Sequence, residues 1–175
     1  MKTRGILLIL FLLLANSCDR GTGYIMVNNK SQIPIACYVA DGVSSGFSYP
    51  DTSLTTTINT YCLTENIANS SVILESRFGY SYDWLLSFTQ EGILSVFVFD
   101  QALADSKGWE LTFSGNNYIV RYDLSVKDLE LLQGTICFPP SELMRNVRMF
   151  PAYEEVVERY PAMVGRPYKE RAELE

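Results

Sequence analysis

The 175-residue chain contains no histidine. Histidine is the side chain that titrates nearest neutral pH and the commonest metal ligand, so its absence excludes a Ser-His-Asp or Cys-His site within this chain. Glycoside hydrolysis remains open, because it needs only two carboxylates. The acids available for such a pair are also typical of turns and caps: Asp41, Asp51, Glu75, Asp83, Glu91 and Asp100. We expect no enzyme, and a carboxylate-dependent glycoside hydrolase is the alternative.

Positive charge is also scarce. The chain has 14 Lys and Arg against 20 Asp and Glu, without a basic cluster. Because nucleic-acid binding depends on Lys and Arg contacts to phosphates, we expect no nucleic-acid partner. The acids follow no calcium-loop pattern and the glycines follow no phosphate-loop pattern. The sequence therefore predicts no metal and no cofactor.

The first 18 residues carry a recognisable order. Lys2 and Arg4 precede a run of nine apolar residues, 6–14, and Ala15 to Ser17 lead into Cys18. A basic start, a short apolar run and small residues are typical of an export signal. A membrane-spanning helix needs about 20 apolar residues, roughly twice this run. We predict that residues 1–17 are a signal peptide.

The cysteine after this signal resembles the lipobox of bacterial lipoproteins. In that motif the cysteine carries the lipid and becomes the first residue of the mature protein, which predicts lipid on Cys18 and a tether over residues 18–23. Ala15 and Ser17 also suit ordinary cleavage, so plain secretion is the alternative. The lipobox implies a bacterial cell envelope, with the outer membrane favoured over the inner and the leaflet undecided.

The rest of the chain has the size of one domain. Alternation and turn residues predict seven strands, at 24–28, 33–40, 54–58, 71–76, 93–99, 117–122 and 135–138. The first two are expected to form a hairpin, with Pro34 placing the second at a sheet edge or delaying its start. Residues 61–69 are expected to hold a short helix or an irregular connection. The predicted fold is a β-sandwich of about seven strands with one or two short helices, over residues 24–150.

One helix start and one tail complete the prediction. Ser125 and Asp128 have capping-box spacing, Leu124 can pack on Leu129 as a hydrophobic staple, and Gly134 suits the helix exit. Residues 151–175 read as a charged, partly mobile C-terminal tail with a helical segment over 153–160.

Two groups of side chains remain open to interpretation. Cys37, Cys62 and Cys137 can supply one disulfide and one free thiol in an oxidising compartment, or they are three small buried hydrophobes. Loop aromatics can form a stacking surface for a glycan or an envelope protein, or they pack within the sandwich. These aromatics are Phe47, Tyr49, Phe78, Tyr80, Tyr82 and Trp84.

The end of the chain resembles a known family. The stretches 118–129, 138–140 and 149–151 are similar to the ending of small lipoproteins of Bacteroidetes. An early strand ending in Asn28 and Asn29, a hydrophobic strand ending in Asp100, and Trp109 after it also match that family. Those proteins often carry a tryptophan where this chain has Gly134 and Thr135. The resemblance implies an envelope location and assigns no activity.

Overall fold

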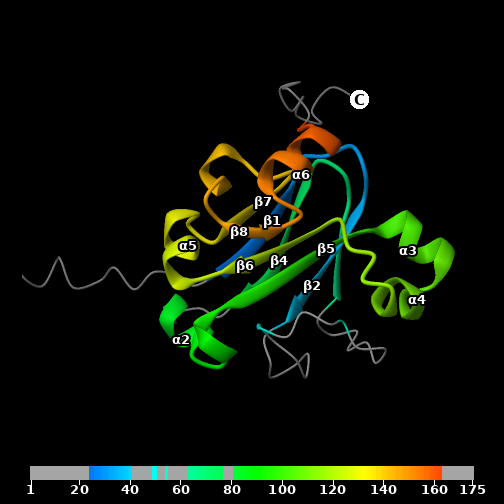
Figure 1. The fold of residues 1–175 in the computed structure, drawn as a ribbon. Helices are drawn as coiled ribbons and strands as arrows, with labels where there is room; N and C mark the ends of the chain where they lie inside the picture. The colour runs from blue at the N-terminus through cyan, green and yellow to red at the C-terminus, as the bar shows by residue number, and fades with distance from the viewer. Residues whose placement is uncertain (1–23, 41–48, 51–53, 55–62, 77–80, 163–175) are drawn as a thin grey trace, which may run out of the picture.

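Alternating side chains arrange the chain into two sheets that pack as a sandwich (Figure 1). The computed structural model describes residues 24–40, 49–50, 54, 63–76 and 81–162. Its strands are β1 (Tyr24–Asn29), β2 (Ile35–Ala40), β3 (Leu63–Asn66), β4 (Ser70–Ser76), β5 (Leu94–Asp100), β6 (Val120–Leu124), β7 (Thr135–Phe138) and β8 (Arg148–Phe150). The small sheet has the order β4-β1-β7 and the large sheet β3-β2-β5-β6-β8. The prediction of a mainly β, sandwich-like fold is confirmed.

Helices are more numerous than expected in the described residues. They are α2 (Tyr82–Leu86), α3 (Gln101–Lys107), α4 (Trp109–Ser114), α5 (Val126–Leu131) and α6 (Tyr153–Arg159). Two 3₁₀ turns accompany them, η2 (Gln90–Gly92) and η3 (Glu142–Met144). The prediction of one or two short helices is therefore wrong, because short helices join most of the strands from β4 onward.

The main core lies between the two sheets. Val27, Ile136, Val96 and Tyr122 belong to one buried cluster, the first two from the small sheet and the others from the large sheet. Apolar side chains alternate along these strands, so every second residue reaches this core. Removing such side chains from water is the main stabilising contribution to the fold.

The predicted helix start is confirmed. Ser125 Oγ accepts from Asp128 N at 3.3 Å, and Ser125 N donates to Asp128 Oδ2 at 2.9 Å, which completes a capping box. Leu124 and Leu129 are fully buried on either side of it. Gly134 leaves the helix with φ 71°, in the left-handed region that favours glycine.

A second core covers the outer face of the large sheet. Phe99 stacks on Phe113 of α4 with ring centroids 5.0 Å apart, and Tyr38 meets Phe113 edge-on at the same centroid distance. Side chains of β5 therefore enter a core on each face of the large sheet. Asp100 caps α3 by accepting from Leu103 N at 3.0 Å.

The expected hairpin of the first two strands is wrong. β1 lies in the small sheet between β4 and β7, and β2 lies in the large sheet between β3 and β5. The Asn29 side chain bonds the backbone of the connection between β1 and β2. Its Oδ1 accepts from Ser31 N at 3.0 Å, and its Nδ2 donates to Ile33 O at 2.9 Å. β2 starts after Pro34, as one alternative predicted, but it is not an edge strand.

Three other boundaries differ from the predictions. Residues 63–66 form β3 rather than a helix or an irregular connection, and Asn66 Nδ2 donates to Val27 O at 3.1 Å, which ties the two sheets together. The strand ending at Phe138 is not the last, because β8 pairs with β6. The predicted strand 54–58 lies outside the described residues except for Leu54, which is buried.

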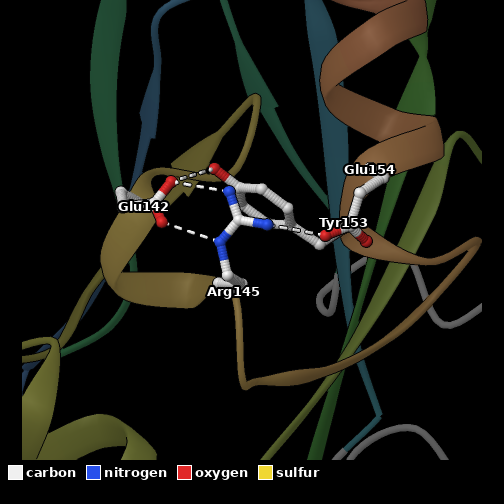
Figure 2. A network of polar contacts seen from close by, with 4 residues as sticks. All are labelled: Glu142, Arg145, Tyr153 and Glu154. Carbon is white, nitrogen blue, oxygen red and sulfur yellow. Dashed lines mark hydrogen bonds and ion pairs between the residues drawn. The ribbon is translucent and has the colours of Figure 1, made fainter.

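The helical segment predicted within the tail is confirmed as α6, and it packs on the main core. Tyr153 and Val156 of α6 are buried, so the packed part of the molecule continues past residue 150. Figure 2 shows the surface contacts at its start: Arg145 donates to Glu142 at 2.7 and 3.0 Å and to Glu154 at 2.7 Å.

The two described cysteines are free thiols. Cys37 and Cys137 are both buried, and Cys62 lies outside the described residues. Burial raises the pKa of the Cys37 thiol to about 12, because the thiolate would lose its hydration. For these two cysteines, the interpretation as small buried hydrophobes holds.

Candidate functional site

The structure places only part of the predicted site. Cys18, Phe47, Phe78 and Tyr80 lie outside the described residues. Tyr49, Tyr82 and Trp84 are described. Tyr49 contacts Arg148 of β8, whereas Tyr82 and Trp84 belong to α2 and contact Tyr24 and Phe88. The predicted aromatics therefore divide into two clusters.

The first cluster belongs to α2. Ser81 starts the helix by accepting from Trp84 N at 3.3 Å. Leu86 is buried in the main core, and Tyr82 and Leu85 are half-buried against it. Three apolar side chains on one side of a five-residue helix fix how α2 sits on the sandwich.

Tyr82 also fixes where α2 sits. Its hydroxyl donates a weak hydrogen bond to Tyr24 O at 3.5 Å. A Cβ built on Gly134 would lie 2.1 Å from Tyr24 O and 2.5 Å from that hydroxyl, so a glycine is needed between them. Burial, with nearby Tyr24 and Glu130, raises the pKa of Tyr82. The α2 helix is thus held against the beginning of β1.

Half-buried Trp84 and exposed Phe88 form the outer part of this cluster. Their ring centroids are 4.8 Å apart with the rings at 78°, the edge-to-face arrangement that aromatic pairs favour. The Phe88 side chain is 52% exposed. Sequence reasoning missed Phe88, although its position four residues after Trp84 is the spacing of neighbours on a helix. We call Trp84 and Phe88 the α2 patch.

The second cluster lies on the outer face of the large sheet at β8. Arg148 donates to the Tyr49 hydroxyl, and its guanidinium lies 5.7 Å from the centroid of the Tyr49 ring. Phe150 is 45% exposed and has the Arg121 guanidinium 4.4 Å from its ring centroid. Arg148 and Phe150 are two residues apart on a strand and so share a face. We call Tyr49, Arg148 and Phe150 the β8 patch.

A buried polar group supports the β8 patch. Arg121 Nη2 donates to Asp123 Oδ2 at 2.9 Å, and Ser95 Oγ donates to Asp123 Oδ1 at 2.7 Å. The side chains of Arg121 and Asp123 are only 7% and 1% exposed. Arg121 Nε has no hydrogen-bond acceptor among the described residues. These contacts hold Arg121 beneath Phe150, the ring of the β8 patch that covers it.

Asp100 lies too far from Asp83 and Glu91 to form the pair of carboxylates that glycoside hydrolysis requires. Asp100 is a helix cap at one end of β5, and Asp83 and Glu91 precede the other end. Seven strand residues at about 3.3 Å each separate them by roughly 20 Å, against the about 5–9.5 Å of a catalytic pair. Glu75 lies in β4, and Asp41 and Asp51 lie outside the described residues.

Other candidate sites are sparse in the described part of the chain. No three His, Cys, Asp or Glu residues come together there as metal ligands. A surface hollow of about 420 Å³ lies between Ile119 and α6, and Glu155, Glu158 and Arg159 line its rim. None of the described helices is long and apolar enough to span a bilayer.

Comparisons with known proteins add no relative. No family model matches the chain. No curated protein and no solved structure is significantly similar to it.

Proposed function

We propose that the chain is a lipid-anchored protein of the bacterial cell envelope, and that its domain is a non-enzymatic interaction module. The leader is the observation that carries this proposal. A basic start, a short apolar run and small residues precede Cys18, which occupies the position that lipidation requires. Two or three acyl chains on one cysteine would anchor the protein stably, because each buried methylene contributes about 0.8 kcal/mol.

The domain suits such an anchor. β1 begins at Tyr24, six residues after Cys18, so a short tether would join the lipid to the folded part. Removing residues 1–17 takes two basic residues and no acids, which leaves 12 basic against 20 acidic residues and a net charge of −8. Charge would therefore not hold the domain on an anionic surface, and the lipid would have to do so.

The β8 patch is the surface we assign to a partner. It combines half-buried Tyr49 with the exposed Arg148 and Phe150 of β8. Aromatic rings add contact area at low entropic cost, and a guanidinium pairs with carboxylate groups. A glycan or an envelope protein carrying acidic groups fits this chemistry, with the outer membrane favoured as its location.

The anchor is tested by fractionating cells that express the full chain or its Cys18→Ala variant. We expect the full chain in the membrane fraction, labelled by a clickable palmitate analogue, and the variant unlabelled and released. An unlabelled full chain, or a variant that stays in the membrane, contradicts the anchor. In the same membranes, Arg148→Ala is expected to weaken cross-linking to the partner, and Leu111→Ala, at an exposed position of α4, serves as the matched control.

A further inference from the structure

We propose that the α2 patch rests on the bilayer surface beside the lipidated Cys18, with Trp84 and Phe88 in contact with zwitterionic lipid. This inference rests on the proposed anchor. It assigns Trp84 to lipid rather than to the glycan or protein partner, and it gives the domain a fixed orientation on the membrane.

The length of the tether limits which surface can reach the bilayer. Six residue steps join Cys18 to Tyr24, and each step spans at most about 3.6 Å, which gives a reach of about 20 Å. A compact domain of this size is about 40 Å across. The surface around the beginning of β1 therefore faces the membrane, and the far side of the domain stays away from it.

The α2 helix belongs to that surface. The Tyr82 hydroxyl of α2 donates to Tyr24 O. Gly134, in the turn after α5, lies against both of these groups. α2 and α5 are in contact, and Figure 1 shows both at the end of the sandwich where β5 begins. The contacts that hold α2 in place are therefore made at Tyr24, the first described residue, six residues after Cys18.

Trp84 lies on the side of α2 that faces away from the core. Successive helical residues are about 100° apart, so Trp84 lies about 200° from both Tyr82 and Leu86, which face the core. Its half-buried ring meets the ring of Phe88, which is half exposed. Tryptophan is enriched at the membrane–water interface, where its ring sits at the headgroup level. Lipid contact explains why an aromatic pair occupies this side.

Charges around the patch decide the kind of lipid. Asp83 and Glu91 flank it and are exposed, and Glu130 of α5 lies near Tyr82. An anionic surface would repel these carboxylates, whereas zwitterionic headgroups would not. We therefore expect shallow contact at the headgroup level, strongest on phosphatidylcholine or phosphatidylethanolamine and weaker when anionic lipid is added.

The two tryptophans of the chain provide the test. Trp109 lies on α4, which Figure 1 shows at the opposite end of the large sheet from α2. The lipidated protein is reconstituted into phosphatidylcholine vesicles with or without brominated acyl chains. Trp109→Phe leaves Trp84 as the reporter, and Trp84→Phe leaves Trp109. For contact at the headgroup–acyl boundary we expect bromine to reduce Trp84 emission at least about twofold more than Trp109 emission.

A matched variant locates the contact. Phe88→Ser should keep the protein on the vesicles through its lipid and reduce the quenching of Trp84. Equal quenching of both tryptophans in protein that floats with the vesicles overturns this inference and leaves the anchor standing. Emission that depends on protein concentration but not on bromine would assign the patch to a second copy of the chain, which also overturns it. Protein that fails to float shows that the anchor itself is wrong.

Discussion

Two arginine–carboxylate pairs in this molecule have the same chemistry and opposite surroundings. Arg121 and Asp123 pair on the outer face of the large sheet, where their side chains are 7% and 1% exposed. Arg145 and Glu142 pair on the surface between η3 and α6, at 48% and 74% exposure (Figure 2). The buried pair lost its hydration on folding, whereas the exposed pair kept most of it, so their contributions to stability are expected to differ greatly.

The contacts around each pair show how the fold uses them. Asp123 also accepts from Ser95, and Phe150 covers Arg121, so the buried pair is closed in by three strands. Arg145 reaches Glu154 and lies 4.7 Å from the Tyr153 ring centroid, so the exposed pair joins η3 to α6 on the surface. The first arrangement fixes side chains beneath the β8 patch. The second adds a solvent-screened link to a helix that the core already holds.

The largest expected effect is that of Asp123→Ala. The substitution leaves the Arg121 charge buried without its carboxylate, and breaking a buried pair in this way costs about 3–5 kcal/mol. The denaturant midpoint of the soluble domain should fall strongly. The slope of the unfolding free energy against denaturant concentration should stay unchanged. A loss of less than about 1 kcal/mol in the free energy of unfolding would mean that water reaches Arg121.

A triple variant separates the charge from the packing. Ser95→Ala, Arg121→Met and Asp123→Leu together remove the buried polar group and keep an apolar filling of similar volume. Such replacements are often neutral or stabilising, so the triple variant should recover most of the lost stability. A triple variant as unstable as Asp123→Ala would show that the outer face needs the ion pair itself.

The sequence predicts the local parts of these two regions and misses the distant ones. The predicted strand 117–122 includes Arg121 but ends before Asp123; in the observed strand β6 the alternation places both on one face. Ser95, 28 residues away, becomes their partner only through the register of β5 with β6. The three residues of β8 are too few to show a period, and β8 supplies Phe150 and Arg148.

Long-range pairing explains the other differences. The first two strands match a hairpin locally, yet β1 pairs in parallel with β7, more than 100 residues later. The aromatics of α2 were recognised as candidates, but their position beside the beginning of β1 depends on Gly134 and Tyr82 meeting at Tyr24. The capping box at Ser125 was predicted fully, because all of its contacts lie within four residues.

That capping box supplies a carboxylate of intermediate burial for the comparison. Asp128 is half-buried, and Ser125 and Asp128 each bond the other's backbone. Ser125→Ala removes the hydroxyl that accepts from Asp128 N and should cost about 1 kcal/mol. Thermal and denaturant unfolding measure the change. Ser125→Thr, which keeps a capping hydroxyl, should lose less; an equal loss would assign the effect to packing rather than to the cap.

The smallest effect is expected at the exposed pair. The hydrogen bond from Arg145, followed by that from Tyr153, lowers the pKa of Glu142 below its ordinary value. Folding therefore favours ionised Glu142, so its contribution is present at neutral pH and is lost as pH falls below about 4.5 through the folded-state pKa. Glu142→Gln should leave the neutral-pH midpoint nearly unchanged and slightly reduce the acid sensitivity of unfolding. Exposed Glu158 on α6, replaced in the same way, serves as the control. A loss for Glu142→Gln as large as that for Asp123→Ala would show that the η3–α6 link, and not burial, decides the strength of ion pairs in this fold.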